Sequence, residues 1–196
     1  MSTIQYAKPV LGIAAFSGTG KTQLLTQLIP SLNKSGIRIA VIKHAHHDID
    51  IDKPGKDSYE IRKAGADTVL VASDKRIALM VEKKEPCPSK IEELLQYIEP
   101  DSVDLVLIEG YKELDYAKLF LFRHEIKDRY QDIDDAIGNI MMQNNTLAIV
   151  TDLDKEALFT KLKTTKTVLD INNIEEIKNF ILNYINTENQ SQPKSE

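Results

Sequence analysis

The sequence contains a single cysteine, Cys87, among its 196 residues. One thiol cannot form a disulfide within the chain, so nothing in the sequence points to an oxidising compartment. Cys87 lies between two prolines, with no histidine close to it in the sequence. Because a catalytic thiol needs a neighbouring base, this pattern argues against a catalytic cysteine.

Long apolar segments and an excess of positive charge are also missing. No apolar run approaches the roughly 20 residues that span a bilayer, and the first ten residues lack the pattern of a secretion signal. We therefore expect a cytoplasmic protein that does not bind membranes. The formal net charge of −5 argues against nonspecific binding to nucleic acid, although it allows local basic patches.

The overall composition is typical of a folded globular protein. Hydrophobic residues make up 42% of the chain and charged residues 28%. A chain of 196 residues can bury a sizeable core. We expect one domain over residues 1–185 and a disordered polar tail over residues 186–196, which contain no apolar anchor.

Strand-like apolar runs alternate with helical patterns along the chain. This alternation predicts a three-layer α/β domain with a mostly parallel sheet, to which the hairpin and the segment 117–123 add antiparallel strands at an edge. Pro30 predicts a kink or break in the first helix, Gly36 its C-terminal cap, and Asp57 or Ser58 the cap of the second helix. Strands are expected over residues 9–16, 37–44, 67–73, 76–82, 103–110, 117–123, 145–152 and 167–171, and helices over 21–36, 56–66, 88–100, 132–143, 153–163 and 173–185.

Two glycines stand between the first predicted strand and the first predicted helix. The segment "AFSGTGKT", residues 15–22, matches the phosphate-binding pattern G-x-x-x-x-G-K-[ST], except that Ala15 replaces the first glycine. Such a loop needs glycine where a side chain would keep backbone N–H groups away from a phosphate. The N-terminus of the following helix adds further donors. The residues predicted to bind nucleotide phosphates are Ser17, Gly18, Thr19, Gly20, Lys21 and Thr22.

The same pattern predicts the position of a magnesium ion. Lys21 would place its charge at the β- and γ-phosphates, and the Thr22 hydroxyl would ligate Mg²⁺. Glu109 ends the apolar run 105–108, where an acid beside Mg²⁺ is expected in this class of fold. The alternatives are a glycine turn without a ligand and a solvated glutamate at a strand end.

Residues 43–58 form the most unusual passage of the chain. If the segment is extended, its even-numbered positions share one side and its isoleucines the other. Three interpretations stay open: a zinc site, a magnesium site with Asp48 or Asp50 in the outer shell, and a solvated loop. The even-numbered positions are occupied by His44, His46, Asp48, Asp50 and Asp52, and His47 is adjacent to them in the sequence.

On these motifs the chain resembles the MobB family of molybdopterin-guanine dinucleotide biosynthesis proteins. The resemblance covers residues 9–123, above all the string K-H-x-H-H-D-x-D-x-D-x-P-G-K-D-S that begins at Lys43. It implies a P-loop NTPase fold and a GTP-binding, Mg²⁺-dependent homodimer with weak GTPase activity. It also implies that the protein assists MobA, the nucleotidyltransferase that joins GMP to molybdopterin, so molybdopterin or its guanylylated form is an expected partner.

The resemblance assigns roles to individual residues. Asp48 matches an aspartate on the magnesium side in the wider group, and Glu109 matches the acid of the family's "EG" motif. Ala15 agrees with the family, but no intact N-K-x-D guanine motif follows a strand. Asp152, after the predicted strand 145–152, is therefore the candidate acceptor for the guanine edge. No general base for water stands out, which fits weak turnover at most.

Two other functions share these motifs. The first is a small-molecule kinase or ligase that uses the same loop on a metabolite, which steady turnover with a small acceptor would reveal. The second is a metal-chaperone GTPase that holds zinc or nickel with His44 and His46. Metal that is retained on purification and lost in His46→Ala would reveal that function.

Overall fold

The computed structural model describes residues 4–45, 51–85, 87–124, 138, 143–153 and 166–191. The chain forms two compact units, of which the first comprises residues 1–44 and 91–196 and the second residues 45–90. The expected single domain over residues 1–185 stays a prediction. In the described part of the chain, no helix has both the length and the apolar character needed to cross a bilayer.

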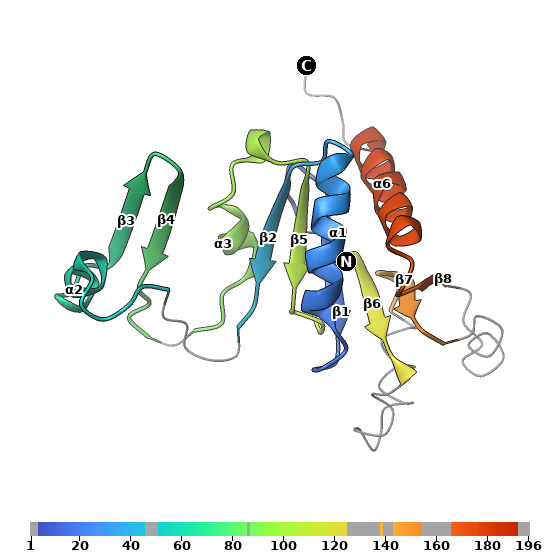
Figure 1. The fold of residues 1–196 in the computed structure, drawn as a ribbon, viewed down its shortest axis with the longest axis horizontal. Helices are drawn as coiled ribbons and strands as arrows, with labels where there is room; N and C mark the ends of the chain where they lie inside the picture. The colour runs from blue at the N-terminus through green and yellow to red at the C-terminus, as the bar shows by residue number, and fades with distance from the viewer. Residues whose placement is uncertain are drawn as a thin grey trace. The chain divides into compact units, whose positions relative to one another are not determined.

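The first unit is built on a six-stranded sheet (Figure 1). The strands lie in the order β2-β5-β1-β6-β7-β8, and every neighbouring pair is parallel. Because both faces of a parallel sheet are covered, its strands are almost continuously apolar. The strands are β1 (Val10–Ala15), β2 (Ile39–Lys43), β5 (Leu105–Glu109), β6 (Lys118–Phe122), β7 (Thr146–Thr151) and β8 (Thr167–Asp170).

Helices cover the two faces of this sheet. On one face α1 (Lys21–Lys34) and α6 (Ile174–Ser191) pack together with inward side chains of the strands. On the other face, α3 (Ile91–Leu95) packs on the alternate residues of β1 and β5, and η1 (Pro100–Ser102) leads into β5. The structure therefore confirms the three-layer α/β architecture with a mostly parallel sheet.

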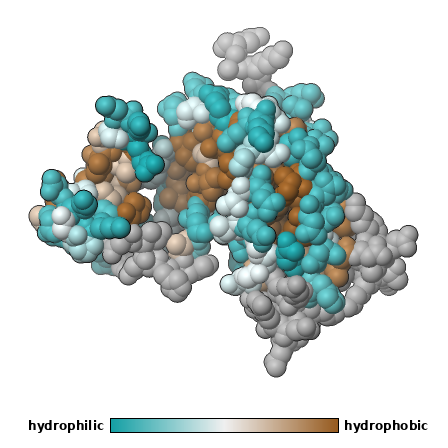
Figure 2. Space-filling model, in the orientation of Figure 1, coloured by the Kyte–Doolittle hydropathy of each residue, from teal (hydrophilic) through white to brown (hydrophobic). Residues whose placement is uncertain are grey.

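The second unit contains α2 (Asp57–Lys63) and the antiparallel hairpin of β3 (Thr68–Ser73) and β4 (Arg76–Val81). The hairpin confirms the two-residue link predicted from the sequence. One face of the hairpin carries Val69 and Met80, which are buried. The other face is apolar and exposed along its length, and hydrophobic residues gather on this unit in Figure 2. The exposed residues of that face are Leu70, Ile77, Leu79 and Val81.

The strand order corrects one prediction. The segment 117–123 was expected as an antiparallel edge strand, but β6 runs parallel between β1 and β7. All five residues of β6 are buried, as an interior strand requires. The β3–β4 hairpin likewise forms a two-stranded sheet of its own instead of extending the edge of the main sheet.

Several element boundaries also differ from the predictions. Helix α1 continues through Pro30, because Leu28 and Leu32 on either side are buried in the core. Lys56, and neither Asp57 nor Ser58, is the N-cap of α2. Helix α6 reaches Ser191, beyond the residue 186 at which the tail was expected to begin. The helices predicted over 132–143 and 153–163 lie mostly outside the described residues.

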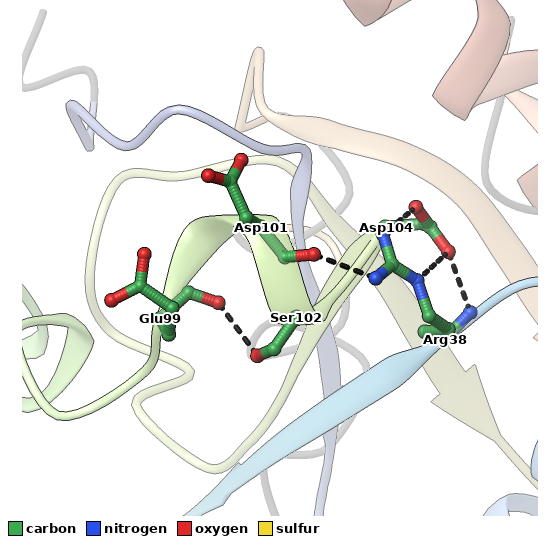
Figure 3. A network of polar contacts seen from close by, with 5 residues as sticks. All are labelled: Arg38, Glu99, Asp101, Ser102 and Asp104. Carbon is green, nitrogen blue, oxygen red and sulfur yellow. Dashed lines mark hydrogen bonds and ion pairs between the residues drawn. The ribbon is translucent and has the colours of Figure 1, made fainter.

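Arg38 and Asp104 join the starts of β2 and β5 (Figure 3). The Arg38 guanidinium donates to both carboxylate oxygens of Asp104 at 2.8 and 3.0 Å, and the Arg38 backbone N–H donates to Oδ2 at 2.8 Å. Arg38 Nη1 also donates to the backbone carbonyl of Asp101 at 2.6 Å. The side-chain and backbone hydrogen bonds from Arg38 lower the pKa of Asp104 to about 2.

We predict that Asp104→Asn lowers the free energy of unfolding at pH 7 by about 1 kcal/mol, the upper range for a solvent-accessible pair. The folded pKa of about 2 lies below the ordinary value of 3.8, so the contribution is complete above 3.8 and is lost as pH falls through 2. Urea unfolding should therefore show a smaller difference between wild type and variant at pH 3 than at pH 7. Asp101→Asn is the matched control, since Asp101 accepts from Arg38 through its backbone. Equal losses in both variants would contradict the prediction.

Candidate functional site

The predicted phosphate loop connects β1 to α1. Gly18 and Gly20 have φ angles of 79° and 89°, a left-handed conformation that L side chains rarely adopt. Helix α1 starts at Lys21 with no side-chain cap and no acidic residue in its first turn. No acidic side chain of this first turn therefore competes for the N-terminal amides of α1, as an anion-binding loop requires.

Thr19 and Lys21 hold the loop in shape. Thr19 is 1% exposed, and its hydroxyl donates to the carbonyl of Phe16 at 2.8 Å. The Lys21 ammonium donates to the carbonyls of Ala15 at 3.3 Å and Phe16 at 3.1 Å, so its side chain folds back toward the end of β1. Burial lowers the pKa of Lys21, while the charge of Glu109 acts in the opposite direction.

Glu109 lies at the end of β5, which pairs with both β1 and β2. Its side chain is only 12% exposed and accepts from the Lys43 ammonium at 3.1 Å. In the parallel pairing of β1 and β5, Glu109 lies opposite Ile13, close to the point where β1 leads into the phosphate loop. The fold thus brings the predicted magnesium acid to the phosphate loop.

Asp152 follows β7 and is joined to the phosphate loop through Arg123. The backbone N–H of His124 donates to Asp152 Oδ1 at 2.9 Å, and Arg123 Nη1 lies 3.8 Å from Oδ2. Arg123 Nε donates to the carbonyl of Thr19 at 3.2 Å. Sequence reasoning missed Arg123, because its position beside the loop follows only from the pairing of β6 with β1.

The backbone after Glu109 makes an unusual turn against His44. Gly110 has φ 114° and Tyr111 has φ 49°, which is uncommon for a residue other than glycine. The His44 backbone N–H donates to the carbonyl of Glu109 at 2.9 Å, and the His44 and Tyr111 ring centroids are 4.5 Å apart. His44 therefore packs on the turn that follows β5.

The metal interpretations of residues 43–58 stay hypotheses. Among the residues that the structure describes, no group of three or more His, Cys, Asp or Glu side chains is placed to hold a metal ion. His46, His47, Asp48 and Asp50 lie outside the described residues. Asp52 is described, and its carboxylate accepts from Arg62 at 2.6 Å, with both side chains 9% exposed.

Comparison with known proteins gives a consistent family assignment. Residues 10–152 match the family model MobB, described as molybdopterin guanine dinucleotide synthesis protein B. The molybdopterin-guanine dinucleotide biosynthesis adapter protein of Escherichia coli (strain K12) is 39% identical over 181 residues, which cover 92% of this chain and 95% of that protein. The adapter protein of Haemophilus influenzae is 39% identical over 177 residues, covering 90% of this chain and 89% of the relative.

Solved structures show the same fold. A crystal structure of molybdopterin-guanine biosynthesis protein B has a TM-score of 0.65 and 23% identity, and the match covers 89% of this chain and 99% of that one. The MobB homologue from Bacillus stearothermophilus has a TM-score of 0.64 and 19% identity, covering 91% and 98% of the two chains.

We predict that Gly110→Ala lowers the free energy of unfolding by about 3 kcal/mol, because strain and a clash add together. A Cβ at Gly110 would lie 2.7 Å from Cβ of His44, in a backbone with φ 114°. Gly36→Ala is the matched control: its φ is 84°, but nothing lies within 4 Å of the added Cβ, so about 1 kcal/mol is expected. Chemical unfolding of both variants measures the difference. Equal losses would show that the contact with His44 does not matter.

Proposed function

Because the chain belongs to the MobB family of molybdopterin guanine dinucleotide synthesis proteins, we propose that it is a GTP-binding adapter of that biosynthesis. The family match over residues 10–152 includes the phosphate loop, Glu109, Arg123 and Asp152. No observation on the described residues favours a small-molecule kinase or a metal chaperone. The expected partners are a MobA-like nucleotidyltransferase and molybdopterin or its guanylylated form.

The observation that carries the proposal is the geometry of the phosphate loop. Two left-handed glycines, an uncapped helix start and the Lys21 ammonium all lie within residues 18–21. Hydrogen bonds that involve a charged group contribute about 1.5–3 kcal/mol each. A few of them from this loop to a triphosphate reach the ~8 kcal/mol of a micromolar site.

The oxygen donors near the loop suit a magnesium ion. The Thr22 hydroxyl and the Glu109 carboxylate are oxygen ligands of the kind that Mg²⁺ prefers. The third proposed donor, Asp48, is taken from the family resemblance and lies outside the described residues. Glu109 already holds a cation, the Lys43 ammonium, in this structure. When bound, Mg²⁺ would neutralise phosphate charge, and Glu109 would then exchange its contact with Lys43 for one with the ion or its waters.

Asp152 is the proposed guanine-recognition residue. Its side chain is 23% exposed, and its Oδ1 accepts from the backbone N–H of His124 at 2.9 Å. A carboxylate has about four acceptor sites, so it can also accept from the N1–H and the amino group of guanine. Adenine presents no such pair of donors. Since no residue stands out as a general base, we propose that hydrolysis is slow at most.

The exposed face of the β3–β4 hairpin supports a homodimer. A two-stranded sheet is marginally stable unless its apolar face is covered. On this hairpin Val69 and Met80 of one face are buried, while Leu70 and Ile77 on the other face are 63% and 71% exposed. A second copy of the chain would cover this face and remove a continuous apolar patch from water. We therefore propose that the hairpins of two copies pack together.

We predict that Lys21→Ala reduces GTP affinity at least tenfold, because the variant lacks the ammonium at the phosphates, equivalent to about 1.4 kcal/mol. Calorimetric titration with GTP and ATP, with and without Mg²⁺, measures this loss. The variant should remain folded, with a single cooperative thermal transition. Asp152→Asn should reduce the preference for GTP over ATP. Unchanged GTP binding by Lys21→Ala would refute the phosphate site.

The adapter role is tested by a separate measurement of product formation. The wild-type protein, added to a MobA-like nucleotidyltransferase with GTP and molybdopterin, should increase formation of the guanylylated product. Lys21→Ala should increase it less. Lys34→Ala, which removes an equal charge at the other end of α1, is the control. Lack of stimulation by the wild type would contradict the adapter role.

We predict that Ile77→Lys converts the dimer to a monomer, because it places a charge in the covered apolar face. Sedimentation velocity measures the mass of each species. Tyr97→Lys, at a residue of the first unit that is 60% exposed, is the matched control and should stay dimeric. A dimer that survives Ile77→Lys would exclude the hairpin as the interface.

A further inference from the structure

Strand β6 begins with Lys118, a lysine that has no exposed surface. Its ammonium donates to the backbone carbonyls of Lys112 at 2.8 Å and Leu114 at 2.6 Å, and to Oε1 of Gln143 at 3.2 Å. All three ammonium donors are therefore used. Burial of a charge costs free energy even when it is hydrogen-bonded, and burial lowers the pKa of this lysine. Nothing in the proposed nucleotide site uses this group directly.

Lys118 and its neighbour Tyr116 together fix the turn between β5 and β6. The Tyr116 hydroxyl donates to the carbonyl of Gly110 at 3.0 Å, and its ring packs against Gly12, where an added Cβ would lie 2.6 Å from a ring carbon. The two side chains thus hold the carbonyls of residues 110, 112 and 114. The turn is anchored at alternate residues along its length.

The anchored turn places Lys112 beside Phe16, at the start of the phosphate loop. The Lys112 ammonium lies 4.9 Å from the centroid of the Phe16 ring, and the carbonyl of Phe16 accepts from Lys21. Lys112 also lies 3.6 Å from Glu113, which is 77% exposed, so that pair contributes little. After burial and the effect of Glu109, the charge of Lys112 is the next largest influence on the pKa of Lys21.

We propose that Lys112 is an additional phosphate-binding residue of the nucleotide site, and that Lys118 positions it there. This inference rests on the proposed nucleotide-binding function. Two lysine ammonium groups beside one loop repel each other, and a bound polyanion would offset this repulsion because it attracts both ammonium groups. Lys112 comes three residues after Glu109, the residue proposed to hold magnesium, and that ion would supply positive charge at the terminal phosphates of a bound nucleotide. The group recognised is therefore the terminal phosphate, and the preferred ligand is a nucleoside triphosphate.

The test is titration of the full-length protein with GTP and with GDP in the presence of Mg²⁺. Lys112→Ala should weaken GTP binding about tenfold, the effect of one charged hydrogen bond, and GDP binding less than about twofold. Lys112→Arg should retain most of the GTP affinity. Lys34→Ala removes the same charge at the far end of α1 and should change neither affinity. Equal losses for GTP and GDP, or no loss, would overturn the assignment.

The positioning role of Lys118 has a separate readout. Lys118→Met keeps the length of the side chain but removes its three hydrogen bonds, and it should lower the ratio of GTP to GDP affinity as Lys112→Ala does. The double variant should lose no more discrimination than either single variant. A lower melting temperature with an unchanged ratio would mean a structural role only. If Lys118→Met does not fold, it is replaced by Tyr116→Phe, which removes only the hydrogen bond from the hydroxyl to the carbonyl of Gly110. This variant should also lower the ratio of GTP to GDP affinity, and an unchanged ratio would contradict the positioning role.

Lys21→Ala, measured in parallel, separates the two proposals. If it loses GTP binding while Lys112→Ala does not, only the role of Lys112 is wrong. If the wild-type protein binds neither nucleotide, the proposed nucleotide site and the role of Lys112 are both wrong.

Discussion

Parallel pairing of six strands is the constraint on which the candidate site depends. When all strands run in one direction, the residues that follow them collect at one edge of the sheet, where α/β proteins bind ligands. Here β1 leads into the phosphate loop, β5 ends at Glu109, and Arg123 and Asp152 follow β6 and β7. Four segments that are distant in sequence thus end at the same edge of the sheet. The opposite edge carries the Arg38–Asp104 pair, which joins β2 to β5.

Positively charged side chains gather at the edge of the sheet where the strands end, in the absence of any ligand. Lys21 and Lys112 lie beside the loop, and Lys43 holds Glu109. Hydrogen bonds from the buried Lys118 ammonium hold the turn that contains Lys112, and the phosphate loop turns at two left-handed glycines. Preorganisation of this kind reduces the entropy lost when a polyanion binds.

The two units of the chain differ in how much of their apolar surface is covered. The first unit has a core on both faces of its sheet and carries the phosphate loop. On the hairpin of the second unit, Val69 and Met80 are buried on one face, while the other face is apolar and exposed, a pattern typical of a surface that is covered in an assembly. The Asp52–Arg62 ion pair lies within this second unit.

Local features of the chain could be predicted from the sequence alone. The phosphate loop, the hairpin link and most strands depend on residues that are neighbours in sequence, so glycine placement and apolar runs reveal them. Glu109 and Asp152 could be predicted as strand-end acids for the same reason. The sequence could not reveal the interior place of β6, the contact of Arg123 with Thr19 across 104 residues, or the burial of Lys118. These features depend on which strands lie side by side. That order is decided by the packing of the whole core, and no short window of sequence records it.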